Sequence, residues 1–382
     1  MEKKKICFVV ATPASAYSFL RNHITALGKD YDVYLAGNGS LSELWKKMDL
    51  CGFYDFPIER NVSLAKDVRA LHSLRKYFST MRFDAVHSVT PKAGLLCAIA
   101  AWMEGIKVRI HIYTGQVWAT RHGVMRSLLK VMDKMIALFD NQLLVDGESQ
   151  RQFLVQEGVI TEKNSCVLAH GSICGVQLEH FVISEDTRRR EREKMGFTDD
   201  DVVYIFMGRL NHDKGIGELY EAFNRLAPKC PNAKLILYGA DEENYEAKAL
   251  AYPKLKRDEN FFYPGKTNCP YNTLQEGDVF VLPTWREGFG SSVIEAQALG
   301  LPVITSDAYG VVDASVAGET GLRCGINDPN GLYECMLKYY SDAELRRTHG
   351  QAGRKRVEEL FDNKLVTDAW IEYYSKLMEH SH

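Results

Sequence analysis

The sequence predicts an α/β protein built from two doubly wound, parallel-sheet domains. Short apolar runs rich in Val, Ile and aromatic residues alternate with segments of helical period, the pattern of βαβ units. This pattern fills the first half of the chain and restarts in the second half. A length of 382 residues fits two domains of ordinary size. The composition, 46% hydrophobic and 25% charged, excludes disordered, collagen-like and coiled-coil classes.

The first domain is expected over residues 1–180 and the second over residues 181–360. In the first domain, helices such as 64–78 and 92–103 separate strands expected at 6–11, 32–36, 85–89, 108–113, 142–145 and 166–169. In the second domain, each expected strand is followed by a Gly or Pro turn and a helical segment. These strands are expected at 202–207, 234–238, 261–263, 279–282 and 303–305.

Residues 171–196 lose strand character and become strongly charged, which predicts a hinge between the domains. Within them, the charged run 188–194 is interpreted as a solvated helix face. The last helical segments, 344–360 and 364–378, have no strand between them. We expect residues 361–382 to form a closing helix that packs back toward the first domain.

Several function classes lack their sequence signature. No apolar run approaches the roughly 20 residues of a membrane-spanning helix, and the apolar stretch after the N-terminal lysines is too short for a secretion signal. The nine cysteines are scattered and never spaced C-x-x-C, which favours reduced thiols in the cytoplasm and opposes a structural zinc site. Dinucleotide, P-loop, zinc-protease and nucleophile-elbow motifs are missing. The first half carries a net positive charge, which fits either an anionic partner or accidental surface composition.

The first strand of the second domain ends in a loop that carries two cations. This loop reads from Gly208 to Gly215 and includes Arg209 and Lys214. A turn from a strand into a helix offers free backbone N–H groups and the positive end of the helix dipole. Phosphate is the ligand that suits such a loop, and two solvated surface cations are the alternative.

A second motif, from Glu287 to Glu295, leads from a later strand into a helix. Its glycines, Gly288 and Gly290, let the backbone approach a ligand closely. Its two carboxylates can grip paired sugar hydroxyls. Glu295 also fits a capping box, in which the acid satisfies the start of the helix. Glu287 has no such alternative explanation.

Taken together, G-R-L-x-x-x-K-G and E-G-F-G-x-x-x-x-E resemble motifs of the retaining glycosyltransferases of family 4. Residues 87–95 resemble the H-x-x-T-P-K-A-G-L segment of bacterial members that build capsules, O-antigens and other surface glycans. Residues 171–181 are similar to the interdomain segment of that family. The resemblance covers nearly the whole chain. It implies a GT-B fold, with an acceptor domain first, a nucleotide-sugar domain second, no catalytic metal and no cofactor.

The resemblance also implies roles for residues of the second domain. Arg209 and Lys214 would bind the donor diphosphate, Glu295 would bind the ribose, and Glu287 would touch the transferred sugar. Arg209, Lys214 and Glu287 are the expected catalytic residues. The remaining expected donor contacts are Gly208, Tyr238, Gly265, Gly288, Phe289, Gly290 and Ser291.

The acceptor is expected at the first domain. The candidate acceptor-side residues are Thr12, Pro13, Ser15, His87, Thr90, Lys92, Thr114 and Gly115. Thr90 and Lys92 flank a proline at a predicted helix start, which suits an acceptor phosphate and equally suits an ordinary helix start. Thr114 stands where related sequences commonly have a histidine before glycine. His111, three residues earlier, is at least as well explained by packing in the sheet.

These features predict a metal-independent, retaining glycosyltransferase of the cytoplasm. It would move a hexose or N-acetylhexosamine from a nucleotide sugar, with UDP as the family's usual nucleotide, to a glycan acceptor linked to polyprenyl diphosphate. No nucleic-acid partner is expected. The alternatives are a nucleotide-sugar 2-epimerase or a phosphorylase of the same fold, and a non-catalytic protein that binds a nucleotide sugar.

Residues 121–139 form a basic and apolar segment that could rest on anionic lipid at the inner face of the plasma membrane. Ordinary packing against the sheet explains the apolar positions as well. The cations recur at four-residue intervals, at Arg126, Lys130 and Lys134. The apolar positions beside them are Leu128, Leu129, Met132, Met135 and Ile136.

Overall fold

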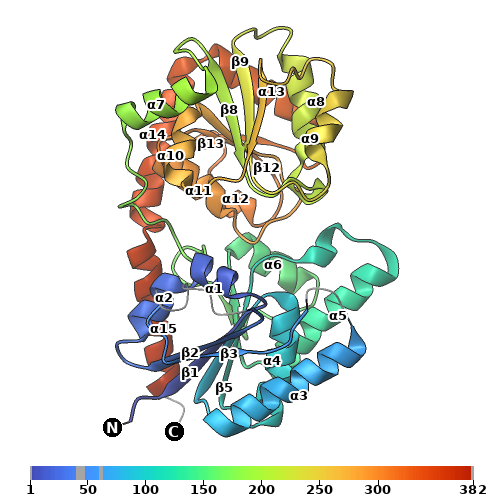
Figure 1. Ribbon diagram of the computed structural model, residues 1–382, viewed down its shortest axis with the longest axis vertical. Helices are drawn as coiled ribbons and strands as arrows, with labels where there is room; N and C mark the ends of the chain where they lie inside the picture. Colours follow the sequence, from blue (N-terminus) through green and yellow to red (C-terminus); the bar gives the residue numbers. More distant parts are fainter. Residues whose placement is uncertain (1, 40–47, 60–62, 380–382) are drawn as a thin grey trace. The chain divides into compact units, whose positions relative to one another are not determined.

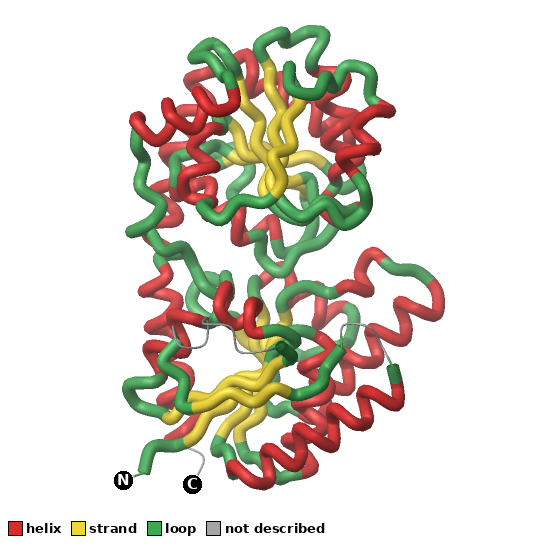
Figure 2. Tube along the Cα trace, viewed as in Figure 1, coloured by secondary structure: helices red, strands yellow, loops and turns green. Residues whose placement is uncertain are grey.

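The computed structural model describes residues 2–39, 48–59 and 63–379 (Figure 1). The chain divides into two compact units. Unit 1 consists of Met1–Cys174 and Asn363–His382, and unit 2 consists of Gly175–Asp362. The boundary predicted from the sequence lies at residue 180. Each unit has a parallel sheet between helices, so the prediction of two α/β domains is confirmed (Figure 2).

In its described part, unit 1 contains a seven-stranded parallel sheet in the order β3-β2-β1-β4-β5-β6-β7. The direction of winding reverses between β1 and β4, the kind of position beside which doubly wound sheets bind ligands. The strands are β1 (Lys5–Val9), β2 (Asp32–Gly37), β3 (Gly52–Asp55), β4 (Ala85–Val89), β5 (Val108–Tyr113), β6 (Gln142–Val145) and β7 (Ser165–Cys166).

Helices cover both faces of this sheet. One face packs on α2 (Arg21–Leu27) and α15 (Asn363–Glu379), with Ile24 and Trp370 in the shared core. The other face packs on α3 (Leu64–Met81) and α4 (Pro91–Met103), with Leu74 and Cys97 in the shared core. The helices in the part of unit 1 that the structure describes are α1 (Pro13–Phe19), α2 (Arg21–Leu27), α3 (Leu64–Met81), α4 (Pro91–Met103), η2 (Val117–Thr120), α5 (Gly123–Phe139), α6 (Glu148–Gln156) and α15 (Asn363–Glu379).

Unit 2 contains a six-stranded parallel sheet in the order β10-β9-β8-β11-β12-β13. Its winding reverses between β8 and β11, so the loops after these two strands meet at one edge. The strands are β8 (Val202–Met207), β9 (Ala233–Tyr238), β10 (Phe261–Gly265), β11 (Val279–Leu282), β12 (Val303–Ser306) and β13 (Gly321–Cys324). The helices are α7 (Glu185–Met195), η3 (His212–Lys214), α8 (Ile216–Leu226), α9 (Tyr245–Lys248), η4 (Ala249–Ala251), α10 (Pro270–Thr273), η5 (Leu274–Glu276), α11 (Ser291–Ala298), α12 (Val311–Ala314), α13 (Pro329–Ser341) and α14 (Ala343–Leu360).

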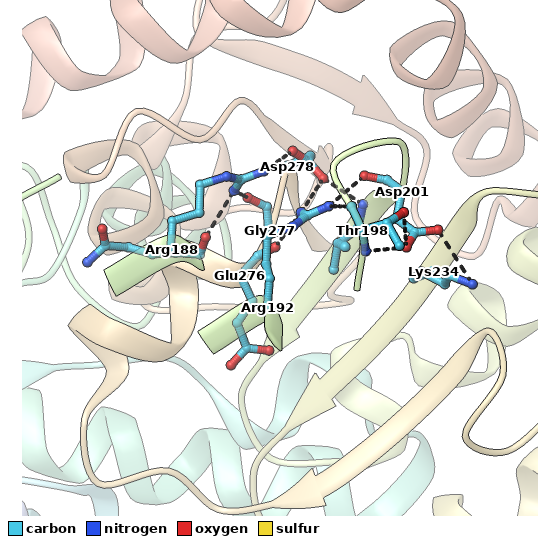
Figure 3. Close-up of polar contacts among 10 residues, drawn as sticks. Arg188, Arg192, Thr198, Asp201, Lys234, Glu276, Gly277 and Asp278 are labelled. Atoms are coloured by element: carbon cyan, nitrogen blue, oxygen red, sulfur yellow. Dashed lines mark hydrogen bonds and ion pairs between the residues drawn. The ribbon is translucent and has the colours of Figure 1, made fainter. Parts of the chain in front are cut away.

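The charged run 188–194 forms a helix, α7, but the interpretation of a solvated face is wrong for part of it. Arg192 is 4% exposed, and its Nη1 lies 3.1 Å from Asp278. Arg188 binds the same carboxylate at 2.6 Å (Figure 3). Asp278 also accepts a hydrogen bond from the backbone amide of Val203 at the start of β8. These arginines therefore fasten α7 to the sheet, because an arginine bound to a carboxylate and to carbonyls can be buried.

The expected strands form, except that the one expected at 166–169 is reduced to the two residues of β7, and two edge strands were not expected. β3 is only partly buried and β13 includes a glycine, so neither has a long apolar run. Gly321 in β13 is required by packing, since an added Cβ would lie 2.4 Å from the Val303 carbonyl oxygen.

Candidate active site

The loop after β8 is fixed at both ends by close backbone contacts. The amide of Leu210, a fully buried residue, donates to the Ala240 carbonyl at 2.8 Å. At the other end Gly215 has a φ of +70°, and an added Cβ would stand 2.0 Å from the Pro283 carbonyl oxygen. Only glycine fits there. The loop is therefore held against the loop that follows β11.

Lys214, on the first of these loops, forms an ion pair with Glu287 on the second. The two side chains are 17% and 14% exposed. The ammonium predicted to bind a diphosphate and the carboxylate predicted to bind a sugar are thus direct neighbours. An anion that reaches this loop would compete with Glu287 for the ammonium of Lys214.

Arg209 is the more open of the two predicted cations. Its side chain is 52% exposed, and Nη1 lies 3.3 Å from Oε2 of Glu242 on the loop after β9. Glu242 also accepts a hydrogen bond from Asn211 at 2.8 Å. An exposed pair of this kind contributes little to stability, about 1 kcal/mol at most. The guanidinium can therefore exchange Glu242 for another anion at small cost.

The turn 288–290 leads from Glu287 into α11. Gly290 is the N-cap with a φ of +94°, and as a glycine it has no side chain to cap the first turn of the helix. The Phe289 ring is buried against Phe361, with centroids 5.2 Å apart. That ring anchors the turn, so only the backbone of Phe289 is left to contact a ligand. Ser291 is the first residue of α11, where amides are suited to an anion.

Glu295 lies in the middle of α11, so the capping-box alternative is wrong. The helix begins at Ser291, four residues before Glu295, and its N-cap residue is Gly290. Glu295 is partly buried, and loss of solvation raises the pKa of its carboxyl to about 7. A group with this pKa exists in both protonation states near neutral pH.

Tyr238, Gly265 and Gly208 lie around the ends of β8, β9 and β10. The Tyr238 side chain is buried and donates a hydrogen bond to Glu276 at 2.8 Å, so its ring is not available to a nucleotide. Gly265 ends β10 with a φ of +90°, and a Cβ there would meet open space. Gly208 follows β8, and its carbonyl lies so close to Gly239 that a Cβ on Gly239 would overlap it.

Three of the acceptor-side candidates follow β1. Thr12 is exposed, and its hydroxyl lies 3.2 Å from the Ser15 hydroxyl. Pro13 occupies the first position of α1. These residues lie at the carboxyl-end edge of the sheet in unit 1.

His87 does not lie in an open site, and its predicted place on the acceptor side is corrected. It is fully buried in β4, with Nδ1 2.8 Å from the Tyr374 hydroxyl and its ring stacked on Trp370. Burial lowers the pKa of His87 well below its usual value. His111 is packed in the sheet, as the alternative proposed, with Nδ1 2.8 Å from the Ser88 hydroxyl. Both histidines are therefore neutral core residues.

Thr90 and Lys92 stand at the start of α4. Thr90 has a φ of +79°, a strained value for a β-branched residue, and its buried hydroxyl has no hydrogen-bond partner within the described ranges. Lys92 is bound to Asp67 of α3 at 2.6 Å. The other two candidates, Thr114 and Gly115, are partly exposed residues that follow β5.

Sequence reasoning missed three residues of the site: Asp213, Glu242 and Arg286. Each pairs with an opposite charge on a neighbouring loop. They could have been found by searching for residues of opposite charge in loops that follow two strands, where those strands are expected to be neighbours in a doubly wound sheet. Within residues 2–39, 48–59 and 63–379, no group of His, Cys, Asp and Glu side chains is arranged to hold a metal ion.

Comparison with known proteins adds independent information. The family described as "Glycosyl transferases group 1" matches residues 187–356, within unit 2. The capsular polysaccharide biosynthesis glycosyltransferase CapM of Staphylococcus aureus is 31% identical over 382 residues, which cover 100% of this chain and 99% of CapM. The UDP-Gal:alpha-D-GlcNAc-diphosphoundecaprenol alpha-1,3-galactosyltransferase of Escherichia coli is 26% identical over 290 residues, 75% of this chain and 74% of that protein.

Solved structures share the fold over nearly the whole chain. HepE of Anabaena, in complex with UDP and glucose, matches with a TM-score of 0.82 and 16% identity, over 98% of this chain and 100% of HepE. Sucrose-phosphate synthase of Thermosynechococcus elongatus matches with a TM-score of 0.81 and 18% identity, over 99% of this chain and 100% of that one. Likeness at this identity concerns the fold alone, and it confirms the predicted pair of Rossmann-like domains of the GT-B type.

Proposed function

The chain belongs to the group 1 glycosyl transferases, and we propose that it is a retaining, metal-independent enzyme of glycosyltransferase family 4. It moves a hexose or N-acetylhexosamine from a nucleoside-diphosphate sugar, a UDP sugar in this proposal, to a growing glycan. The acceptor is a glycan linked to polyprenyl diphosphate, and the product is a bacterial surface polysaccharide. The chain acts in the cytoplasm and needs no cofactor.

The observation that carries this proposal is the Lys214–Glu287 ion pair beside the start of α11. In the proposed complex the donor diphosphate takes the place of Glu287 against the ammonium. Glu287 is then free to accept hydrogen bonds from hydroxyls of the sugar. Arg209, already loosely held, binds the same diphosphate. Two cations and the amides of the 288–291 turn then surround one diphosphate.

The chemistry follows from where charge develops. As the bond between the anomeric carbon and the diphosphate breaks, the sugar becomes oxocarbenium-like and the diphosphate gains negative charge. Cations fixed in advance stabilise that charge, and one such group typically contributes about 3 to 4 kcal/mol. The leaving diphosphate helps to deprotonate the acceptor hydroxyl on the same face, so the configuration at the anomeric carbon is retained. No covalent nucleophile is required.

On the acceptor side, the start of α4 supports a phosphate contact. Thr90 has an unpartnered hydroxyl there within the described ranges, and the helix start favours negative charge. The E. coli relative is named as an enzyme that acts on a diphosphoundecaprenol-linked sugar. We therefore place the diphosphate of a lipid-linked acceptor near Thr90.

A lipid-linked acceptor implies contact with a membrane, and α5 supports that contact. No described helix is long and apolar enough to cross a bilayer. Ile136 on α5 is buried against the sheet, so packing explains part of the apolar pattern. Packing does not explain the apolar side chains of α5 that are 50% to 85% exposed, which are Val124, Met125, Leu128, Val131 and Leu138. An exposed apolar stripe on one helix suits the surface of a bilayer.

The cations of α5 contribute less to that surface than the sequence indicates. Arg126 and Lys130 both bind Glu157, at 2.8 Å and 2.6 Å. Lys134 is the remaining member of the three and is exposed. Liposome flotation tests the surface with vesicles that contain anionic phosphatidylglycerol. We expect Leu128→Glu with Leu138→Glu to abolish flotation and Leu250→Glu, on an 83% exposed residue of unit 2, to leave it unchanged. Flotation that is indifferent to all these changes, to lipid charge and to salt would exclude the α5 surface.

A transfer assay tests the proposed function directly. Radiolabelled nucleotide sugars are incubated with the chain, with and without a polyprenyl-diphosphate-linked saccharide. The proposal predicts an elongated lipid-linked product with the donor's anomeric configuration, formed only with the acceptor. A donor epimerised without acceptor would identify a 2-epimerase, and binding without turnover would identify a non-catalytic protein. Release of a sugar 1-phosphate from the saccharide when inorganic phosphate is added, with the nucleotide sugar left intact, would identify a phosphorylase.

A further inference from the structure

Besides Lys214 and Glu287, the two loops of the proposed donor site are joined by Asp213. The carboxylate oxygen Oδ2 of Asp213 accepts two hydrogen bonds from Arg286, from Nε at 2.9 Å and from Nη2 at 2.7 Å. The Asp213 carbonyl accepts two more, from the Thr284 hydroxyl and from the Trp285 amide, both at 2.8 Å. One residue of the loop after β8 is thus bound to three consecutive residues after β11.

We call the Asp213–Arg286 pair and its backbone contacts the clamp. The clamp is partly buried, and neighbouring elements hold it through further hydrogen bonds. The two side chains are 19% and 14% exposed. Trp285 donates from its indole to Glu218 of α8 at 3.0 Å. The Thr284 carbonyl accepts a hydrogen bond from Ser306 at the end of β12. A guanidinium that makes two bonds in a partly buried place is held more firmly than an exposed ion pair.

The position of the clamp gives it a role. Asp213 precedes Lys214 in the sequence, and Arg286 precedes Glu287. In the proposed complex a diphosphate takes the place of Glu287 against Lys214, so it breaks the ion pair that joins the loops at the next position. The clamp is not formed by either of these two side chains. It can therefore keep the loops in place while Lys214 changes its partner.

We propose that Asp213 and Arg286 are positioning residues that hold Lys214 where it meets the diphosphate of the donor. This inference rests on the proposed function. The two residues act through Lys214 and do not touch the donor themselves. Positioning of this kind matters because a cation displaced by about 1 Å loses much of its effect on the reacting group.

A purely structural role would have a different signature. Loss of a structural pair lowers the stability of unit 2 and weakens every property of the site together. Loss of a positioning pair weakens diphosphate binding in particular, and has no further effect once Lys214 is absent. A double-mutant cycle separates the two cases, since residues that act as one unit are not additive.

The test measures binding of UDP and of uridine to the full chain by calorimetry, with GDP, ADP and TDP as further probes. The variants are Arg286→Gln, Asp213→Asn, Lys214→Ala and Lys214→Ala with Arg286→Gln. The matched control is Arg75→Gln in unit 1, where Arg75 makes the same two-nitrogen contact with one oxygen of Glu104, at 3.0 Å from each nitrogen. Thermal unfolding of each variant reports its stability, and Arg286→Lys serves as a conservative second variant.

We expect Arg286→Gln and Asp213→Asn to weaken UDP binding roughly tenfold, a typical coupling within one network. The affinity of these variants for uridine stays within about twofold of the wild-type value. Arg75→Gln changes neither the affinity for UDP nor that for uridine. Arg286→Lys recovers part of the affinity for UDP that Arg286→Gln loses. Adding Arg286→Gln to Lys214→Ala costs nothing more. Equal losses for UDP and uridine, or an additive loss in the double variant, would overturn the positioning role while leaving the donor site standing. A wild-type chain that binds none of the four nucleoside diphosphates would overturn both proposals.

Discussion

At the scale of single residues, Lys214 has the most direct place in the proposed chemistry. Its ammonium is paired with the carboxylate of Glu287. The loop that carries Lys214 is held in place by Gly215 and by backbone contacts. A cation fixed in this way needs little rearrangement when a diphosphate arrives. Its attraction for the leaving group then grows as that group gains charge, which is how a fixed cation accelerates a reaction.

Lys214→Ala is expected to lower turnover at saturating donor about a hundredfold, the lower end of the effect of removing one such group. Lys248→Ala is a suitable control, because Lys248 is 51% exposed and belongs to the same unit. It lies outside the loops that follow β8 and β11. Steady-state transfer of the labelled sugar measures both variants. Near-normal turnover of Lys214→Ala would show that the ammonium does not act on the leaving diphosphate.

Glu295 predicts a pH dependence of donor binding. Its pKa of about 7 in the free protein means that the carboxyl is mostly protonated below that pH and ionised above it. Only the carboxylate can accept hydrogen bonds from both ribose hydroxyls, so affinity rises with pH. If the ionised form alone binds, affinity falls about tenfold from pH 8 to pH 6. A UDP sugar is the right probe, since its diphosphate does not titrate in this range.

The matched variant for this prediction is Glu295→Gln, which has no proton to gain in this range. Its affinity for the UDP sugar is expected to be the same at pH 6 and pH 8. If Glu295→Gln instead kept the pH dependence of the wild-type chain, the titrating group would not be Glu295.

The residues show what a sequence can and cannot predict of this site. Arg209, Lys214 and Glu287 are predicted from motifs, because a strand end followed by a helix start defines where a loop lies. Their partners are not predicted, since Lys214 meets a residue 73 positions away. His87 shows the opposite case. Its motif was found, but its burial under α15 depends on packing between the two ends of unit 1.

At the scale of elements, α15 is attached to unit 1 through one aromatic residue in particular. Trp370 is 1% exposed and stacks with two histidine rings, with centroid distances of 4.3 Å to His23 and 5.0 Å to His87. The three rings are nearly parallel, with interplanar angles of 5° and 7°. Stacking of this kind adds to the burial of a large apolar surface.

Trp370→Ala is expected to lower the unfolding free energy of unit 1 by about 3 to 5 kcal/mol, the usual cost of deleting a buried aromatic side chain. Glu372→Ala, on the same helix and 68% exposed, is expected to change it by less than about 0.5 kcal/mol. Chemical denaturation followed by circular dichroism measures both. Equal effects of the two substitutions would mean that the helix is not held by this stack.

Helices show why periodicity alone is an incomplete guide. On α7, the charges predicted a solvated face. Arg192 is nevertheless buried, because Asp278 and backbone carbonyls accept hydrogen bonds from its guanidinium. On α5, the apolar positions predicted a single stripe, but the helix has a buried side with Ile136 and an exposed side with Leu138. In both cases the spacing gave the helix correctly, and the neighbouring elements decided which side chains became buried.

At the scale of the whole molecule, the chain forms two units that each have their own sheet and hydrophobic core. All the predicted donor residues belong to unit 2. A donor should therefore stabilise unit 2 against unfolding, by about 2.7 kcal/mol at 100 times its dissociation constant. Hydrogen exchange measures this stabilisation separately in the two units, with β8 reporting on unit 2 and β1 on unit 1. Equal protection of both strands would contradict a donor site that lies within unit 2.

The division into two sheets was predictable from the repeated strand and helix pattern. The return of residues 363–379 to unit 1 was expected from the absence of a strand between the last two helices. The edge strands β3 and β13 were not predictable, because short and partly polar segments gain their pairing from a neighbour that is already in place.

A crystal structure of the chain with a bound UDP sugar tests the proposed donor site most directly. The proposed donor site requires that the diphosphate contacts Arg209 and Lys214, that Glu287 has left Lys214 for the sugar, and that Asp213 and Arg286 remain paired. A diphosphate bound elsewhere, with the Lys214–Glu287 pair unbroken, would contradict it.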